Sequence, residues 1–290
     1  MRLAKRNHTM RTWQTVLCIV LSVGGAFAAE PTTQQGAMVS PKLTEEEVKA
    51  IQGMSTSELA KLVQTGNRSQ QEHAVSALVS RDEGRLLLGL ARNGPRATND
   101  VIFESFVPVA RRDDDAEAQQ LVDDYVSFME GQLKSESPIV SPEQAVRCLG
   151  RVAYFGAKET QRPGQPAREV HFGYERVVGD LVGLLKDKRI IVGDAAVSWL
   201  DNVGGYTAEQ ALEVIAALGA YRQTVAAQPV ANKEESRNQE MRLAKINQAI
   251  RDVTAEQERR IKEAATQPDS PTRQGESPNR PANTGEHEVK

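Results

Sequence analysis

The sequence is poor in the side chains from which metal sites are usually built. It has 2 cysteines and 4 histidines in 290 residues, and the histidines stand apart from one another. Zinc sites need such ligands clustered at short, defined spacings. The carboxylate run Asp113–Asp115 lacks the glycine and the distal glutamate of a calcium-binding loop. We therefore expect no metal centre.

Signals for a bound nucleotide or for covalent catalysis are missing as well. Residues 156–160 contain Gly, Lys and Thr, but their spacing differs from that of a phosphate-binding loop and no strand precedes them. We expect Gly156 to end a helix instead. Ser76 and Ser198 fall inside expected helices and outside any Gly-x-Ser-x-Gly turn. We expect no cofactor and no catalytic residue, so the chain is predicted not to be an enzyme.

The first 28 residues have the composition of a secretory signal peptide. Four basic residues and no acidic residue precede Glu30, an apolar run follows at 16–28, and this run ends in Ala26-Phe27-Ala28. The apolar core is shorter than the roughly 20 residues that cross a bilayer. We expect cleavage after Ala28, no membrane span in the mature chain, and a location in the periplasm or outside the cell.

Cleavage would change both the charge and the cysteine content of the chain. It removes four of the 36 basic residues and none of the 39 acidic ones, which leaves a net charge of about −7. An acidic surface argues against non-specific binding to nucleic acid, which needs a basic footprint. Cleavage also removes Cys18, so Cys148 would have no partner for an internal disulfide and the fold would depend on its core.

Helix-start signals recur along the rest of the chain, whereas strand-like alternation is nearly absent. Five segments have the form of a capping box, in which the first side chain and another three residues later satisfy free backbone N–H groups. They begin at Thr44, Ser55, Ser69, Ser141 and Thr207. Between these signals apolar residues recur at helical spacing, as in residues 121–133 and 177–185. The sequence therefore predicts an all-α fold.

One five-residue pattern occurs three times within the expected helices. It reads Ala-Val-Ser-Ala-Leu at 74–78, Ala-Val-Arg-Cys-Leu at 145–149 and Ala-Val-Ser-Trp-Leu at 196–200. In each copy the alanine and the leucine are four residues apart and share a helix face, where a small residue lets a neighbouring helix approach closely. We expect these faces, with Cys148, to be buried between helix pairs that stack on one another.

The third copy and its surroundings resemble the HEAT-repeat family. Residues 184–187 end an apolar helix at an acidic turn, and residues 192–204 continue with paired alanines, a leucine and a closing Val-Gly. Gly193 stands where the family has arginine. Residues 149–152, and more loosely 59–78, are similar to the same pattern. The copies lie 71 and 51 residues apart, whereas the family repeats at about 40–47 residues. The resemblance implies an irregular HEAT-like array of antiparallel helix pairs, an α-α superhelix.

These features divide the chain into five segments. A signal peptide at 1–28 precedes a polar linker at 29–42 and an α-helical repeat-like domain at 43–230. Residues 231–266 are predicted to form one long charged helix. Residues 267–290 are rich in Pro, Ser, Asn and Gly and are predicted to be a disordered tail.

The long helix at 231–266 has a short apolar seam with two possible uses. Leu243, Ile246, Ile250 and Val253 keep a 3-4-3 spacing among many charges, and Gln257 then occupies the next seam position. Two heptads are too few to establish a coiled coil. The helix either caps the array or packs in a dimer.

Trp199 is the candidate partner anchor. It is the only tryptophan left after cleavage, and the equivalent positions hold the smaller Ala77 and Cys148. A larger side chain there either fills the core or protrudes to contact a partner. HEAT repeats mostly present surfaces to partners, so the resemblance implies an exported scaffold that binds another protein. A self-associating structural or envelope protein, joined through 231–266, and an uncharacterised enzyme remain as alternatives.

Overall fold

The computed structural model describes residues 42–108, 116–160 and 172–266. Within these residues it contains eleven helices and no strand, so the all-α prediction is confirmed. The predicted signal peptide 1–28, the predicted tail 267–290, almost all of the linker 29–42 and the run Asp113–Asp115 lie outside the described residues.

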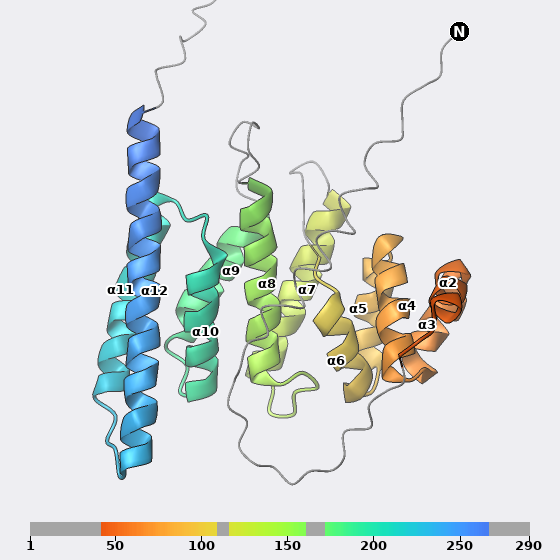
Figure 1. The fold of residues 1–290 in the computed structure, drawn as a ribbon, viewed down its shortest axis with the longest axis horizontal. Helices are drawn as coiled ribbons and strands as arrows, with labels where there is room; N and C mark the ends of the chain where they lie inside the picture. The colour runs from red at the N-terminus through yellow and green to blue at the C-terminus, as the bar shows by residue number, and fades with distance from the viewer. Residues whose placement is uncertain (1–41, 109–115, 161–171, 267–290) are drawn as a thin grey trace, which may run out of the picture. The chain divides into compact units, whose positions relative to one another are not determined.

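The helices form two layers, and from residue 116 onward successive helices alternate between them. They are α2 Glu45–Gly53, α3 Thr56–Thr65, α4 Arg68–Ser80, α5 Gly84–Asn93, α6 Arg96–Ser105, α7 Ala116–Lys134, α8 Pro142–Thr160, α9 Phe172–Leu184, α10 Ile190–Val203, α11 Ala208–Ala226 and α12 Lys233–Thr266. Helices α8, α10 and α12 pack side by side in one layer, and α5, α7, α9 and α11 do so in the other. Successive helices such as α7 and α8, or α11 and α12, join the layers (Figure 1).

The predicted capping boxes at Thr44, Ser55 and Thr207 are confirmed. Each of these side chains accepts a hydrogen bond from the backbone N–H three residues later, and the Glu or Gln there bonds back to the cap. Ser141 Oγ accepts from the Gln144 N–H at 3.2 Å, directly before α8. These caps satisfy backbone donors that a helix start leaves free. They therefore fix where four of the helices begin.

The prediction of a cap at Ser69 is wrong. Helix α4 is capped by Asn67, whose Oδ1 accepts from the Gln70 N–H at 3.0 Å, while Gln70 Oε1 accepts from the Asn67 N–H at 3.0 Å. An asparagine with a glutamine three residues later makes the same reciprocal pair as Ser with Glu. Ser69 consequently lies in the first turn of the helix.

The prediction that Gly156 ends a helix is also wrong. Helix α8 continues to Thr160, and Gly156 is buried inside it. A Cβ atom at Gly156 would lie 3.4 Å from Tyr174 Cβ of α9. This is an ordinary contact distance, so the glycine lies in the interface of α8 with α9 and ends no helix.

The three copies of the repeated pattern lie on α4, α8 and α10, and their alanines and leucines form the core. Ala74, Leu78, Ala145, Leu149, Ala196 and Leu200 are all fully buried. Cys148 is 1% exposed, which confirms its predicted core position. Burial raises the pKa of its thiol to about 11, so the sulfur stays protonated and behaves as an apolar group.

Helix α12 packs against both α10 and α11. Its seam residues Ile246 and Val253 are buried at 1% and 3% exposure, and Leu243 and Ile250 pack at the edge of the same core. Gln239 Nε2 donates to the backbone oxygens of Val225 and Gln228 at 2.7 and 2.9 Å, where α11 ends. The apolar seam of α12 is therefore covered within the chain.

Candidate functional site

The interface between α10 and α12 carries an ion pair, a facing pair of carboxyl groups and a pocket. Arg242 of α12 forms an ion pair with Asp194 of α10, with Nε 2.8 Å from Oδ2. Further along each helix in the C-terminal direction, Asp201 of α10 faces Asp252 of α12. The two helices therefore run in the same direction, with α11 packed against α12 between them in the chain.

A three-residue network holds one end of this interface. Tyr221 Oη of α11 donates to Asp194 Oδ1 at 2.8 Å, and Arg242 Nη2 donates to Tyr221 Oη at 3.1 Å. Burial, together with the bond to Asp194, raises the pKa of Tyr221 to about 12, so it remains a donor at neutral pH. Gly193 leaves room for the phenol, because a Cβ there would lie 2.5 Å from Tyr221 Oη. The network ties α10, α11 and α12 together.

Three large apolar side chains are exposed within four residues of Asp194 or Arg242 in the sequence. Ile190 and Ile191 begin α10, one turn before Asp194, and are 51% and 52% exposed. Met241 directly precedes Arg242 and is 54% exposed. We call Ile190, Ile191 and Met241 the apolar triad. Exposed large apolar side chains are candidate anchors for a partner.

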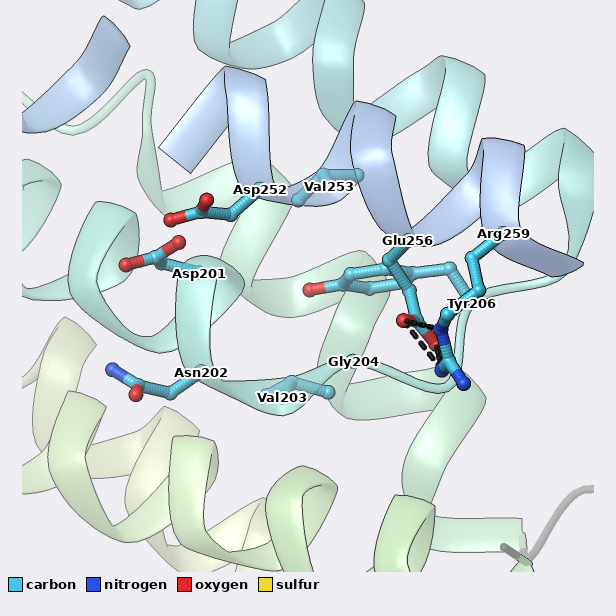
Figure 2. Close-up of a pocket in the computed structure, with 9 residues that line it drawn as sticks. All are labelled: Asp201, Asn202, Val203, Gly204, Tyr206, Asp252, Val253, Glu256 and Arg259. Atoms are coloured by element: carbon cyan, nitrogen blue, oxygen red, sulfur yellow. Dashed lines mark hydrogen bonds and ion pairs between the residues drawn. The ribbon is translucent and has the colours of Figure 1, made fainter. Parts of the chain in front are cut away.

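A pocket of about 240 Å³ lies at the other end of the interface. Its walls are the end of α10, the turn that follows, and Asp252, Val253, Glu256 and Arg259 of α12 (Figure 2). The turn reverses the chain through Gly204 and Gly205, whose φ angles of 62° and 77° favour glycine. Tyr174 Oη of α9 donates to the Gly204 oxygen at 2.7 Å and fixes this turn.

The carboxyl groups around the pocket differ in how their charge is balanced. Arg259 Nη2 and Arg260 Nε donate to Glu256 at 2.6 and 2.9 Å. Burial opposes this charge, but the two arginines together lower the pKa of Glu256. Asp201 instead points toward Asp252 (Figure 2), and burial followed by the nearby Asp252 carboxylate raises the pKa of Asp201. Asp201 therefore holds a proton more readily than an isolated aspartate does, whereas Glu256 is ion-paired.

The structure places Trp199 of α10 against α8. Its side chain is partly buried and packs on the core. The ring lies over Gly150, where an added Cβ would come within 2.1 Å of Trp199 Cγ. The extra size of Trp199 relative to Ala77 and Cys148 is thus matched by a glycine on the facing helix. Only the outer part of the ring is available to a partner.

Sequence reasoning did not identify the apolar triad or the Asp194 network. Ile190 and Ile191 look like two more core residues in an apolar run, and the pairing of Asp194 with Arg242 joins residues 48 positions apart. The doublet of isoleucines directly before the Val192 helix pattern gives no local signal of exposure, because adjacent apolar residues such as Leu87 and Leu88 are both buried elsewhere in the chain. Among the described residues, no group of three or more His, Cys, Asp or Glu could hold a metal ion.

None of the described helices is both long enough and apolar enough to cross a membrane. No protein-family model matches the chain, and no curated protein matches it. Among solved structures the chain is similar to an engineered protein whose crystal structure was determined by the Northeast Structural Genomics Consortium. The two share 16% identity over 72% of this chain and 88% of that one, with a TM-score of 0.40. A likeness at this level supports no inference about function.

Proposed function

We propose that the mature chain is an exported α-helical scaffold that binds another protein through the α10–α12 surface. The observation that carries the proposal is the apolar triad, whose three members are all more than half exposed next to a fixed polar network. A contact site of this kind combines apolar anchors with polar groups that are already held in place. Trp199, partly exposed on the same helix, would extend it toward α8.

A HEAT-like α-α superhelix is the architecture that we propose for this scaffold. Supporting it, α8, α10 and α12 pack in one layer and α7, α9 and α11 in the other, and three copies of the alanine-leucine pattern are buried in α4, α8 and α10. Stacked helix pairs bury each other's faces and leave long surfaces for partners. The helix α12 then closes the array, since its seam is covered and its outer face is rich in charged residues.

Replacing Ile190 and Ile191 by glutamate is expected to abolish partner binding without unfolding the chain. Both side chains are half exposed, and negative charge in the first turn of a helix is favoured by its dipole. Loss of one apolar anchor at a binding hot spot costs about 2 kcal/mol, which lowers affinity roughly thirty-fold. The measurement is capture of proteins from the periplasm and culture fluid by the tagged mature chain, followed by titration of the captured partner.

The matched control is Leu212→Glu, because Leu212 is 62% exposed near the start of α11. This variant should bind as the unchanged chain does. Circular dichroism and light scattering of all three proteins check that they fold and share one mass. Equal capture by the double variant and the unchanged chain contradicts the proposed surface. A chain that captures nothing and forms a defined oligomer instead supports the self-associating alternative.

Export is expected to remove residues 1–28. Expression of the whole chain in a bacterial host should yield a periplasmic or secreted product whose first residue is Ala29, read by N-terminal sequencing. Replacing Ala26 and Ala28 by a bulky residue such as leucine should leave the precursor uncut, because the peptidase accepts small side chains at those positions. A product that stays in the cytosol with Met1 intact contradicts export.

A further inference from the structure

Two pairs of carboxyl groups face one another across neighbouring helices in the C-terminal half of the domain. Glu130 of α7 meets Asp180 of α9, and Asp201 of α10 meets Asp252 of α12. In both cases the two groups come within hydrogen-bonding reach across a helix interface. Two ionised carboxylates in this arrangement repel each other, whereas one shared proton turns the contact into a hydrogen bond.

The surroundings of the Glu130–Asp180 pair supply too little positive charge for two ionised groups. Arg176 Nε and Nη2 donate to Glu130 Oε1 at 3.0 and 2.8 Å, but the same guanidinium also forms an ion pair with Asp123. Lys134 is the further cation near the pair. Asp180 Oδ2 is buried without a hydrogen-bond partner. A proton held between Asp180 and Glu130 would satisfy this atom, and an ionised pair would leave it unpaired.

The Asp201–Asp252 pair also has little positive charge near it. Gln248 Nε2 donates to both oxygens of Asp252 at 2.8 and 2.7 Å, which adds a neutral donor and no positive charge. Lys245 is the cation that acts on Asp201. The other charged groups of the pocket, Glu256 and Arg259, are engaged with each other. Figure 2 shows the two aspartates converging at one side of the pocket, away from that ion pair.

We propose that these two carboxyl pairs make the packing of α9 on α7 and of α12 on α10 depend on pH, because each pair binds one shared proton in the folded state. Acidification then tightens the C-terminal half of the domain. Rising pH ionises both pairs and weakens the same two interfaces. This response does not depend on the proposed partner binding.

The direction of the effect follows from proton linkage. Burial is the first cause that raises the pKa of Glu130, Asp180 and Asp201, and the facing carboxyl adds to it for Glu130 and Asp201. The folded chain therefore binds these protons more tightly than the unfolded chain. Stability contributed by the pairs is complete below the ordinary carboxyl pKa of about 4 and is lost as pH rises through the raised values. A carboxyl whose pKa rises by about 1 on folding changes the unfolding equilibrium about tenfold.

Other carboxyl groups make the folded state less stable, not more stable, as the pH is lowered. Hydrogen bonding from Arg189 lowers the pKa of Asp187, and the pKa of Glu256 is also lowered. Stability from these groups is present above about pH 4 and is lost below it. The two effects are separated by comparing variants at each pH between about 4.5 and 7.5, where the groups with a lowered pKa stay ionised.

The test is urea unfolding of the whole chain across this pH range for the unchanged protein and for Asp180→Asn and Asp252→Asn, singly and together. An amide donates to the facing carboxylate at every pH, so each variant should flatten the decline in stability with rising pH. At pH 7.5 each should unfold less readily than the unchanged chain, by about tenfold in the unfolding equilibrium for every unit by which folding raises the pKa of the pair. Glu258→Gln, on the exposed side of α12, is the control and should keep the original slope.

An unaltered slope in the double variant overturns the proposal. If either variant fails to fold, carboxyl-carbon NMR titration of the unchanged protein decides instead. Titration of Asp180 and Asp201 at the ordinary aspartate value of about 3.9 overturns the proposal, and titration clearly above it supports the shared proton. Neither measurement involves a partner, so failure here leaves the proposed scaffold function intact.

Discussion

Replacing Gly150 by alanine is expected to lower the free energy of unfolding by about 1–3 kcal/mol, although alanine is the better helix former. The new Cβ would lie 2.1 Å from Cγ and Cδ2 of Trp199, so the indole ring must move out of its place between α8 and α10. These atoms belong to the rigid base of the ring and cannot swing aside as a chain end could. Urea unfolding followed by Trp199 fluorescence measures both the lost stability and the displaced ring.

Gly179→Ala is the matched control for this substitution. Gly179 lies in α9, and a Cβ added there would have no other atom within 4 Å, so alanine should be neutral or stabilising by up to about 1 kcal/mol. Trp199→Ala should largely abolish the cost of Gly150→Ala, because the two sites are in contact and their effects should not add. Simple additivity in the double variant would contradict the packing of Trp199 on Gly150.

Replacing Arg151 by methionine is expected to cost about 2–3 kcal/mol of stability. Arg151 is 8% exposed, and its Nη1 donates to the backbone oxygens of Phe103 and Glu104 at 2.9 and 2.8 Å. These oxygens lie in the last turn of α6, where the helix leaves acceptors free and carries negative partial charge. Methionine keeps most of the apolar volume but leaves both oxygens without their donor. Chemical unfolding measures the loss.

Arg147→Met provides the comparison, since Arg147 is exposed one turn earlier on the same helix. A change within about 0.5 kcal/mol is expected there. Hydrogen exchange adds a local readout: in Arg151→Met the amides at the end of α6 should exchange faster than in the unchanged chain. Equal stability of the two variants would contradict the role of Arg151 in holding α6 to α8.

The all-α fold, four of the eleven described helix starts and the buried faces could be predicted because each depends on residues close together in the sequence. Capping involves positions three apart, and each copy of the alanine-leucine pattern in α4, α8 and α10 spans little more than one helix turn. The errors at Ser69 and Gly156 arise where a competing interaction decided the outcome. At Ser69 a second valid cap, Asn67, lay two residues away, and at Gly156 the helix continues to Thr160 with the glycine buried against α9. The HEAT-like architecture stays a prediction.

The candidate site could not be predicted because its residues are far apart in the sequence. Asp194, Tyr221 and Arg242 come from three helices, and the two ends of this network are 48 residues apart. Whether Trp199 reaches solvent depends on the glycine at position 150 of another helix. The exposure of Ile190 and Ile191 depends on which face of α10 the neighbours cover. The sequence does not show how neighbouring helices align, so it does not show which residues of an apolar run remain exposed to solvent.

The helix packing described above has a kinetic consequence. The principal contacts of every described helix are with helices no more than two places away in chain order, as between α8 and α10 or between α11 and α12. Such a topology has low contact order, because only short stretches of chain must close before favourable contacts form. Folding can therefore begin at several points and spread from helix to helix. Packing of α12, the last helix in the described part of the chain, completes the burial of α10 and α11.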